Sequence, residues 1–164
     1  MLTCTRRIHF SSGHRVWRHE SKCAHLHGHN YVAFFQAHAD DLDALGRVID
    51  FGELKTRLGA WIDRHWDHGF LLHRDDHEAI EAVTKVPGQK VFLMDNNPTA
   101  ENIARHLLCQ VAPRELEGTG VRVVRVCVWE TENCSAEHSL PEQRGVYQTL
   151  LPFPDTVSGG RDHA

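Results

Sequence analysis

The chain has 164 residues, enough to bury a hydrophobic core without disulfides, and we expect a single domain. Its net charge of −4, the lack of a long run of Lys or Arg and the shortness of its apolar stretches argue against nucleic-acid and membrane partners. The N-terminal residues lack the apolar run of a signal peptide, and the cysteines number five, which predicts free thiols in a soluble cytoplasmic protein.

The N-terminal part of the sequence predicts two neighbouring strands. Residues 2–10 alternate between apolar and polar side chains, and residues 26–38 do the same. Between them, residues 15–25 are mostly polar and predict a loop. The Ser-Ser-Gly at 11–13 is suited to a bulge or bend before His14.

Two amphipathic helices are predicted further along the chain. The segment DFGELKTRLGAWIDRHW, residues 50–66, has apolar side chains at helical spacing, and its first residue can cap the helix. The segment NNPTAENIARHLLCQVAP, residues 96–113, has a second apolar stripe. Asn97 or Thr99 can cap this second helix, and Pro113 is expected to end it.

The C-terminal part of the sequence predicts two further strands. The β-branched segment 120–132 is one and residues 146–151 are the other, while residues 156–164 are expected to form a flexible tail. The order strand, strand, helix, helix, strand, strand predicts an α+β domain over residues 1–155. We expect an antiparallel four-stranded sheet with two helices on one face. Residues 69–96 have no clear pattern and could add a short helix and a strand.

The segment CAHLHGHNY places three histidines at alternate positions. Alternate side chains of a strand point to the same face, so His25, His27 and His29 would project together. Neutral imidazoles bind Zn2+ well, and His14, at the end of the preceding strand, is the candidate for a ligand from the neighbouring strand. The alternative is that these histidines are exposed at a strand end. His25 in particular either joins the ligands or points to solvent.

Cys23 leaves the type of metal site open. Three protein nitrogens would leave the fourth coordination position of zinc free, as in catalytic zinc sites. Cys23 could be a fourth ligand, which would close the site, or it could act as a base or nucleophile beside the ion.

The chain resembles the 6-pyruvoyl-tetrahydropterin synthase family over about residues 5–150. The resemblance rests on six motifs in the same order: FSSGHR, CAHLHGH, VIDFGELK, WDH, PTAEN and WETE. The C-x-x-x-H-G-H spacing is tighter than in animal biopterin-pathway members and is similar to that of the bacterial 6-carboxy-tetrahydropterin synthases of the queuosine pathway. The resemblance implies a T-fold whose trimers close into a barrel and stack as homohexamers, with active sites between subunits.

The resemblance also implies the site residues. The zinc ligands would be His14, His27 and His29. The residues that move protons would be Cys23 as the general base, helped by Asp67 and His68 of a neighbouring subunit. The residues that contact the pterin would be Glu130 and Thr99.

Two of these assignments can be weighed against the sequence pattern. Glu130 shares the parity of three valines, Val124, Val126 and Val128, and a carboxylate on an apolar face is costly unless paired. A pterin amino group and ring N–H could both donate to it, whereas the plain alternative is a glutamate turned to water. Adjacent residues such as Asp67 and His68 can face one site only in a turn, which Gly69 permits.

For function, the resemblance implies a zinc-dependent lyase that converts 7,8-dihydroneopterin triphosphate to 6-carboxy-5,6,7,8-tetrahydropterin, releasing acetaldehyde and triphosphate, for queuosine or deazapurine biosynthesis. The alternatives are the biopterin-type reaction, which gives 6-pyruvoyl-tetrahydropterin, and a non-catalytic zinc-binding or assembly protein with a closed site. Arg15, Arg18 and Lys22 are candidates for the triphosphate site because they lie close to the metal loop in sequence. The segment 69–96 is longer than in compact members and is expected near the site entrance.

Overall fold

The computed structural model describes residues 2–141, and within them six strands form one sheet in the order β4-β3-β1-β2-β5-β6. The strands are β1 Thr3–His14, β2 His27–Ala39, β3 Gly69–His73, β4 Val91–Met94, β5 Val121–Thr131 and β6 Cys134–Ser139. β1, β2, β5 and β6 pair antiparallel, whereas β3 lies parallel to β1 and β4 parallel to β3. The α+β class is confirmed, but the predicted sheet had two strands too few and lacked the parallel part. A long helical connection between β2 and β3 allows that parallel pairing.

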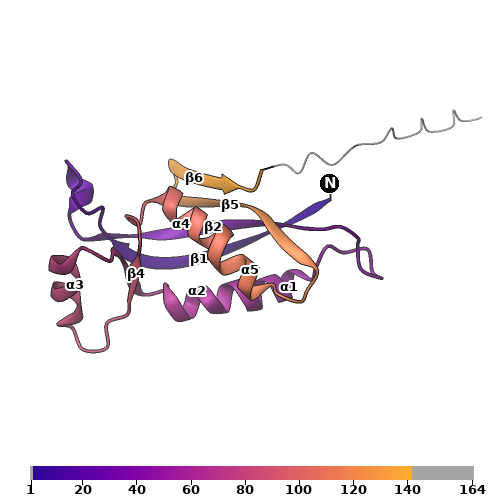
Figure 1. Ribbon diagram of the computed structural model, residues 1–164, viewed down its shortest axis with the longest axis horizontal. Helices are drawn as coiled ribbons and strands as arrows, with labels where there is room; N and C mark the ends of the chain where they lie inside the picture. Colours follow the sequence, from indigo (N-terminus) through magenta and orange to yellow (C-terminus); the bar gives the residue numbers. More distant parts are fainter. Residues whose placement is uncertain (1, 142–164) are drawn as a thin grey trace, which may run out of the picture.

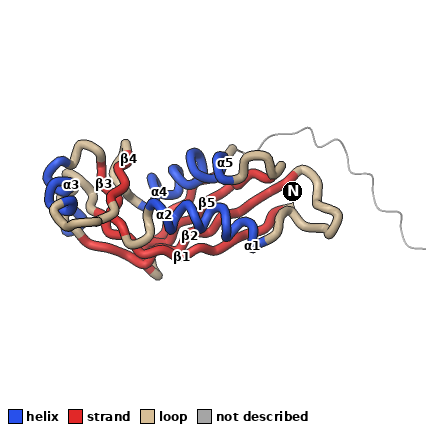
Figure 2. Tube along the Cα trace, turned by 90° about the horizontal axis from the view of Figure 1, so that it is seen from below, coloured by secondary structure: helices blue, strands red, loops and turns tan. Residues whose placement is uncertain are grey.

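Two long helices cover one face of the sheet, and a short one lies at its end (Figures 1 and 2). Their segments are α1 Phe51–Leu54, a π-helical turn Lys55–Gly59 and α2 Ala60–His65, then α4 Ala100–His106, a π-helical turn Leu107–Val111 and α5 Ala112–Glu115. Both helices were predicted. Thr99, not Asn97, caps α4, because its side chain accepts a hydrogen bond from Asn102 N. Pro113 does not end the second helix, since the wider π-helical turn directly before it accommodates the proline ring.

The segment 69–96 forms a small unit beside β1. It consists of β3, α3 His77–Thr84 and β4, so the expected helix and strand are present together with a second strand. The unit has its own apolar cluster of Leu72, Ala79 and Val83. The predicted strand 146–151 and tail 156–164 lie outside the described residues. The described residues instead add β6, which begins at Cys134. Among the helices described, none is long and apolar enough to cross a membrane.

The core lies between the sheet and the two long helices, and its strand face leads directly to the histidines. Alternate residues of β1 and β2 are buried on this face, such as Phe10, Tyr31 and Phe35. The same parity continues to His14 at the end of β1 and to His29 and His27 at the start of β2. The core therefore fixes which way the three imidazoles point.

The pairing of β1 with β2 is regular through the Ser-Ser-Gly segment. Each residue keeps its partner from Thr3 opposite His38 to His14 opposite His27, so the expected bulge at 11–13 is wrong. Gly13 serves packing instead, because an added Cβ would lie 2.4 Å from the Phe70 ring. The irregularity occurs between β2 and β5, where the pairing of β5 skips Val124.

Candidate active site

Three imidazoles converge at the end of the core face. His14 of β1 lies directly opposite His27 of β2, and His29 follows two residues later on the same face. One ring nitrogen from each lies within 4.8 Å of the other two, and the Nε2 atoms of His14 and His27 are 3.0 Å apart. Two nitrogens bound tetrahedrally to one zinc ion would lie about 3.3 Å apart. The trio therefore has the spacing of a metal site.

Two backbone carbonyls set the tautomers of these rings. His14 Nδ1 donates to Pro98 O at 2.8 Å, and His27 Nδ1 donates to His25 O at 2.7 Å, because a carbonyl oxygen can only accept. The Nε2 atoms then carry lone pairs that face each other, an arrangement that repels unless a cation or proton lies between them. This donor set fits a divalent metal ion. The His25 ring is exposed and outside the trio, so His25 contributes its carbonyl only.

Burial favours the neutral, metal-binding form of His14 and His29. His14 is 2% exposed, and burial, together with the neighbouring His27 and His29, lowers its pKa to about 4. Burial also lowers the pKa of His29, against the opposite effect of Glu130. His14 is therefore neutral at pH 7 and has a lone pair to offer.

Glu130 lies at the edge of the trio. Its Oε1 is 3.4 Å from His14 Nε2 and 3.7 Å from His29 Nε2, and the Tyr31 hydroxyl donates to it at 3.5 Å. Burial and Glu130 raise the pKa of Tyr31, so this hydroxyl keeps its proton. Sequence reasoning missed Tyr31, although it shares the histidine parity. Val126 and Val128 are buried on the Glu130 face, as expected, whereas Val124 is removed from it by the irregularity in β5.

Asp67 and His68 form a hydrogen-bonded pair on the turn between α2 and β3. His68 Nδ1 lies 2.6 Å from Asp67 Oδ2, and Ser11 N donates to Asp67 Oδ1 at 2.8 Å. Burial alone would raise the pKa of Asp67, but these two hydrogen bonds outweigh it and lower the pKa. The turn depends on His68 itself, which has φ 56°, rather than on Gly69, which begins β3. The pair is an ionised carboxylate that orients an imidazole with an 81% exposed side chain.

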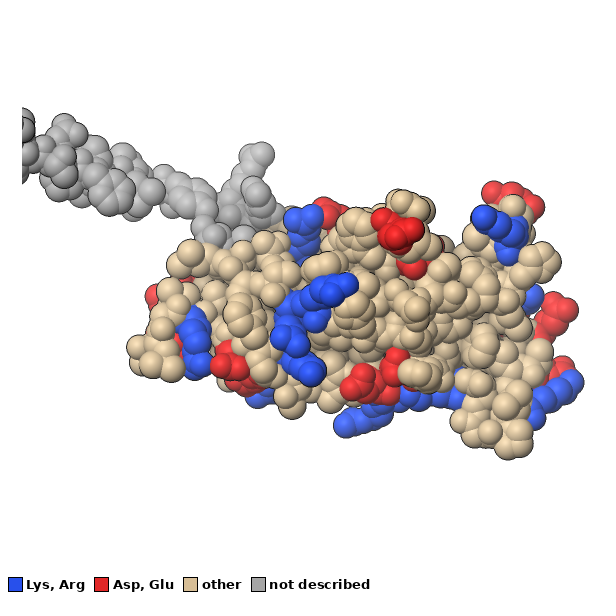
Figure 3. All heavy atoms as spheres, turned by 180° about the vertical axis from the view of Figure 1, so that it is seen from behind, with Lys and Arg blue, Asp and Glu red and all other residues tan. Residues whose placement is uncertain are grey.

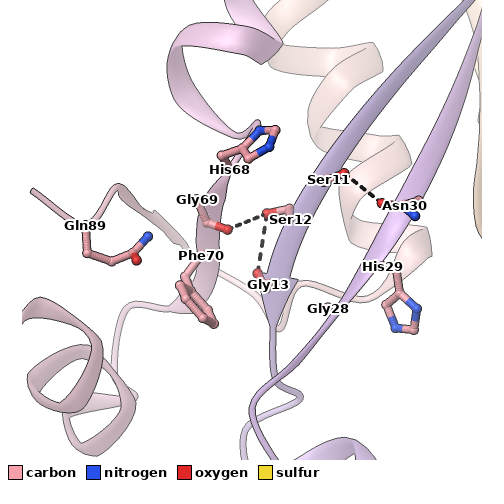
Figure 4. A pocket seen from close by; sticks show the side chains of 10 residues that line it. All are labelled: Ser11, Ser12, Gly13, Gly28, His29, Asn30, His68, Gly69, Phe70 and Gln89. Carbon is pink, nitrogen blue, oxygen red and sulfur yellow. Dashed lines mark hydrogen bonds between the residues drawn. The ribbon is translucent and has the colours of Figure 1, made fainter. Parts of the chain in front are cut away.

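The structure does not bring this pair to the imidazole trio within one chain. A hollow of about 380 Å³ includes His68 at one rim and His29 at the other. Figure 4 shows their side chains on opposite sides of β1 and β2, with the backbone of Gly13 and Gly28 between them. The His68 and His29 side chains therefore do not point toward one another.

Cys23 lies in the loop between β1 and β2, in a short 3-10 turn over Lys22–Ala24. Its side chain is half-buried, and its carbonyl accepts a hydrogen bond from Val16 N at 2.8 Å. Over residues 2–141, the group of mutually close metal-ligand atoms contains the three imidazoles and excludes Cys23. All five cysteines are free thiols, as predicted.

The expected triphosphate residues differ in their surroundings. Arg15 is paired with Asp76, which is 1% exposed, and with Glu78. Burial opposes ionisation of Asp76, but hydrogen bonds from Arg15 and from Ala79 N lower its pKa. Arg15 thus links the loop between β1 and β2 to the start of α3, and the carboxylates of Asp76 and Glu78 already compensate its charge.

Arg18, Lys22 and Thr99 are placed differently. The Arg18 guanidinium lies over the Trp17 ring, 4.1 Å from its centroid, and both Arg18 and Lys22 are exposed. The Thr99 hydroxyl accepts from Asn102 N at 3.4 Å as the cap of α4. Of the basic residues predicted from the sequence, Arg18 and Lys22 remain candidates for an anion.

Comparison with known proteins gives consistent matches over most of the chain. A family model described as 6-pyruvoyl tetrahydropterin synthase matches residues 3–141. The 6-carboxy-5,6,7,8-tetrahydropterin synthase of Rickettsia felis is 45% identical over 137 residues, covering 84% of this chain and 99% of that protein. The protein of the same name from Aquifex aeolicus is 31% identical over 151 residues, covering 79% of this chain and 92% of that protein.

Solved structures agree on the fold. An uncharacterised protein from Wolinella succinogenes has a TM-score of 0.69 at 25% identity, covering 84% of this chain and 97% of that one. The 6-pyruvoyl tetrahydropterin synthase of Caenorhabditis elegans has a TM-score of 0.60 at 20% identity, covering 85% and 96%. The T-fold expected from the sequence is thereby confirmed.

Proposed function

The chain belongs to the 6-pyruvoyl tetrahydropterin synthase family, and on that premise we propose that it is a zinc-dependent 6-carboxy-5,6,7,8-tetrahydropterin synthase. It converts 7,8-dihydroneopterin triphosphate to 6-carboxy-5,6,7,8-tetrahydropterin with loss of acetaldehyde and triphosphate, in the cytoplasm, for queuosine or deazapurine biosynthesis. The observation that carries the proposal is a trio of converging imidazoles, two of which direct Nε2 lone pairs at each other, in a chain 45% identical to a protein of that name.

The trio supports zinc as the resident metal. His14, His27 and His29 would hold it through Nε2, and the carbonyls of Pro98 and His25 would fix two of the rings. Zinc bound there would supply a Lewis acid that makes the C–H protons beside a diol easier to remove. Because three ligands converge among residues 2–141, a fourth coordination position would stay open for the substrate side chain.

The remaining residues then have roles in proton transfer and binding. Cys23 is the general base that removes the C–H proton, and His68, held by Asp67, relays protons at the exposed side of the site. Glu130 accepts hydrogen bonds from the amino group and ring N–H of the pterin. Thr99 contacts the pterin at the start of α4, close to the Pro98 carbonyl that holds His14.

We propose a homohexamer, a dimer of trimers, in which Asp67 and His68 serve the site of a neighbouring copy. The exposed direction of His68, away from the trio of its own chain, supports this. The sheet face opposite the core also has a hollow of about 620 Å³, where Val32, Phe34 and Trp129 lie among polar and charged side chains such as Arg7 and Glu132. The side of the molecule seen in Figure 3 has charges of both signs separated by wide uncharged areas. Such a face suits burial against other copies of the chain.

The proposal is tested by incubating the zinc-loaded protein with 7,8-dihydroneopterin triphosphate and identifying every product by mass spectrometry. Release of acetaldehyde together with 6-carboxy-5,6,7,8-tetrahydropterin is the expected result. Formation of 6-pyruvoyl-tetrahydropterin without acetaldehyde would assign the biopterin-type reaction instead. Unchanged substrate with one tightly bound zinc ion per chain would indicate a non-catalytic zinc protein.

A further inference from the structure

The turn at residues 97–99 contacts both the imidazole trio, through His14, and the loop of residues 15–25 that contains Cys23, here called the Cys23 loop. Its Pro98 carbonyl accepts from His14 Nδ1 at 2.8 Å. The side-chain amide of the preceding residue, Asn97, forms two hydrogen bonds to the backbone of Trp17. Its Oδ1 accepts from Trp17 N at 2.8 Å and its Nδ2 donates to Trp17 O at 3.0 Å. One amide therefore satisfies both backbone groups of a loop residue, as a neighbouring strand would.

The hydrogen bonds continue from Trp17 to Cys23. Val16, the residue before Trp17, donates from its backbone N to Cys23 O at 2.8 Å. The turn that contains Cys23 is closed by His25 N donating to Lys22 O at 3.0 Å, and the His25 carbonyl then holds the His27 ring. Cys23 is thus linked to a metal ligand on one side and to the Asn97 amide on the other.

Burial does little to hold this loop. The turn Lys22–Ala24 contains no buried residue, so few apolar contacts oppose its opening. Asn97, by contrast, is well fixed, because its own carbonyl accepts from Thr99 N at 2.8 Å and from Asn102 Nδ2 at 2.8 Å. The loop consequently depends on the hydrogen bonds from Asn97, on the pairing of Arg15 with Asp76, and on the stacking of Trp17 on His73, whose ring centroids are 4.8 Å apart.

We propose that Asn97 is a positioning residue that holds the Cys23 loop in place beside the three imidazoles. This inference rests on the proposed function for the role of Cys23, but the loop geometry it describes stands on the contacts alone. Both side-chain hydrogen bonds of Asn97 go to the backbone of Trp17, so Asn97 acts through Trp17 and not by direct hydrogen bonds to the imidazoles or the Cys23 thiol. Its loss would leave both backbone groups of Trp17 without their partner and let the loop open.

The test compares Asn97→Ala with the matched control Asn96→Ala, which alters the exposed neighbouring asparagine. In Asn97→Ala we expect one zinc ion per chain, as in the wild type, and faster backbone hydrogen exchange confined to residues 15–25. We expect kcat to fall about 10- to 100-fold, since a misplacement of about 1 Å costs up to that much, with KM within about threefold. Asn97→Asp keeps the acceptor for Trp17 N and should give an intermediate kcat. Asn96→Ala should match the wild type in every respect.

Several outcomes would overturn the inference. Wild-type exchange at 15–25 in Asn97→Ala would show that the amide does not hold the loop. Loss of zinc from a folded Asn97→Ala protein would mean that the residue acts on His14 rather than on Cys23. If Asn97→Ala does not fold, the same readings on Asn97→Asp decide the matter. A wild-type protein that does not turn over the pterin, combined with faster loop exchange in Asn97→Ala, would reject the proposed function but retain the loop assignment.

Discussion

The histidine strands and the acid–base loops are built in different ways. His14, His27 and His29 stand on two paired strands whose register is unbroken and whose face continues the core. Cys23 stands in a loop turn without buried residues, and His68 is 81% exposed on a turn. One chain therefore brings the three candidate metal ligands together but leaves the proposed proton-transfer groups apart.

This difference assigns separate tasks to the two regions. Strand register is fixed by the core, so the ligand geometry should persist whatever the loops do. The loops are held by a few hydrogen bonds, such as those of Asp67 with Ser11 and His68, and under the proposed function they would complete a site together with substrate or a neighbouring copy. The two regions should accordingly respond differently to mutation.

The largest effect is expected for His27→Ala. Removal of one of three ligands should abolish stoichiometric zinc binding and lower kcat/KM on the order of 10⁴-fold, because the Lewis acid is lost with it. The matched control is His25→Ala, which removes an exposed ring but keeps the carbonyl that orients His27. Metal analysis and steady-state kinetics should find the control close to wild type. An equal loss of zinc in both variants would contradict the assigned ligands.

Cys23→Ala should change turnover without changing zinc binding, and so distinguish the loop from the histidine strands. We expect a folded protein with one zinc ion per chain and a turnover reduced on the order of 10³-fold, which is typical for loss of a general base. Cys109→Ala, which removes an exposed thiol elsewhere, should leave turnover unchanged. If Cys23→Ala instead loses its zinc, the sulfur is a ligand and the open-site account is wrong.

Mixing experiments test whether the loops of different copies work together. His68→Ala should bind zinc normally and lose turnover on the order of 10²-fold. When His68→Ala and Cys23→Ala chains are unfolded together and refolded at equal ratio, about a quarter of the sites between copies should contain both intact residues. Activity should then rise well above that of either variant alone. No rise in verified mixed oligomers would place both residues of each site on one chain.

The smallest effect is a pH dependence of the metal-free protein. The folded pKa of His14 is about 4, below its usual 6.5, so the unfolded chain takes up a proton first as pH falls. The contribution of His14 to the free energy of unfolding should therefore be fully present above pH 6.5. It should decrease by roughly 3 kcal/mol as the pH falls toward 4, for a pKa shift of this size. Urea unfolding of the wild type and of His14→Gln at pH 7 and pH 4.5 measures this decrease in the free energy of unfolding. A fall of the same size in His14→Gln would assign the effect to other groups.

Alternation of side chains was enough to predict β1 and β2, and their pairing placed His14 beside His27. The same pattern could not reveal β6, because its residues are polar and largely exposed at the edge of the sheet. Nor could it reveal β3, a five-residue strand with no visible alternation that pairs with distant β1. Strands that owe their place to long-range pairing leave little trace in local sequence.

The sequence predicted the side chains of the site better than the backbone and amide groups that orient them. Spacing and strand pairing indicated a histidine cluster but left His25 open, and the family resemblance implied His14, His27 and His29 as the ligands. The carbonyls of Pro98 and His25 and the amide of Asn97 had no signal of their own. A backbone carbonyl is present at every residue, so its use as an orienting group appears only in three dimensions. The turn at Asp67 and His68 was expected, but it was attributed to Gly69. The positive φ is at His68, and the sequence could not show this because any residue can be forced into positive φ by its surroundings.

X-ray absorption at the zinc edge tests the central claim most directly. The account predicts one zinc ion per chain, with nitrogen and oxygen neighbours at about 2.0–2.1 Å, no sulfur, and an unchanged spectrum in Cys23→Ala. A sulfur neighbour at about 2.3 Å that disappears in Cys23→Ala would contradict it, since the metal would then have no free position for a substrate.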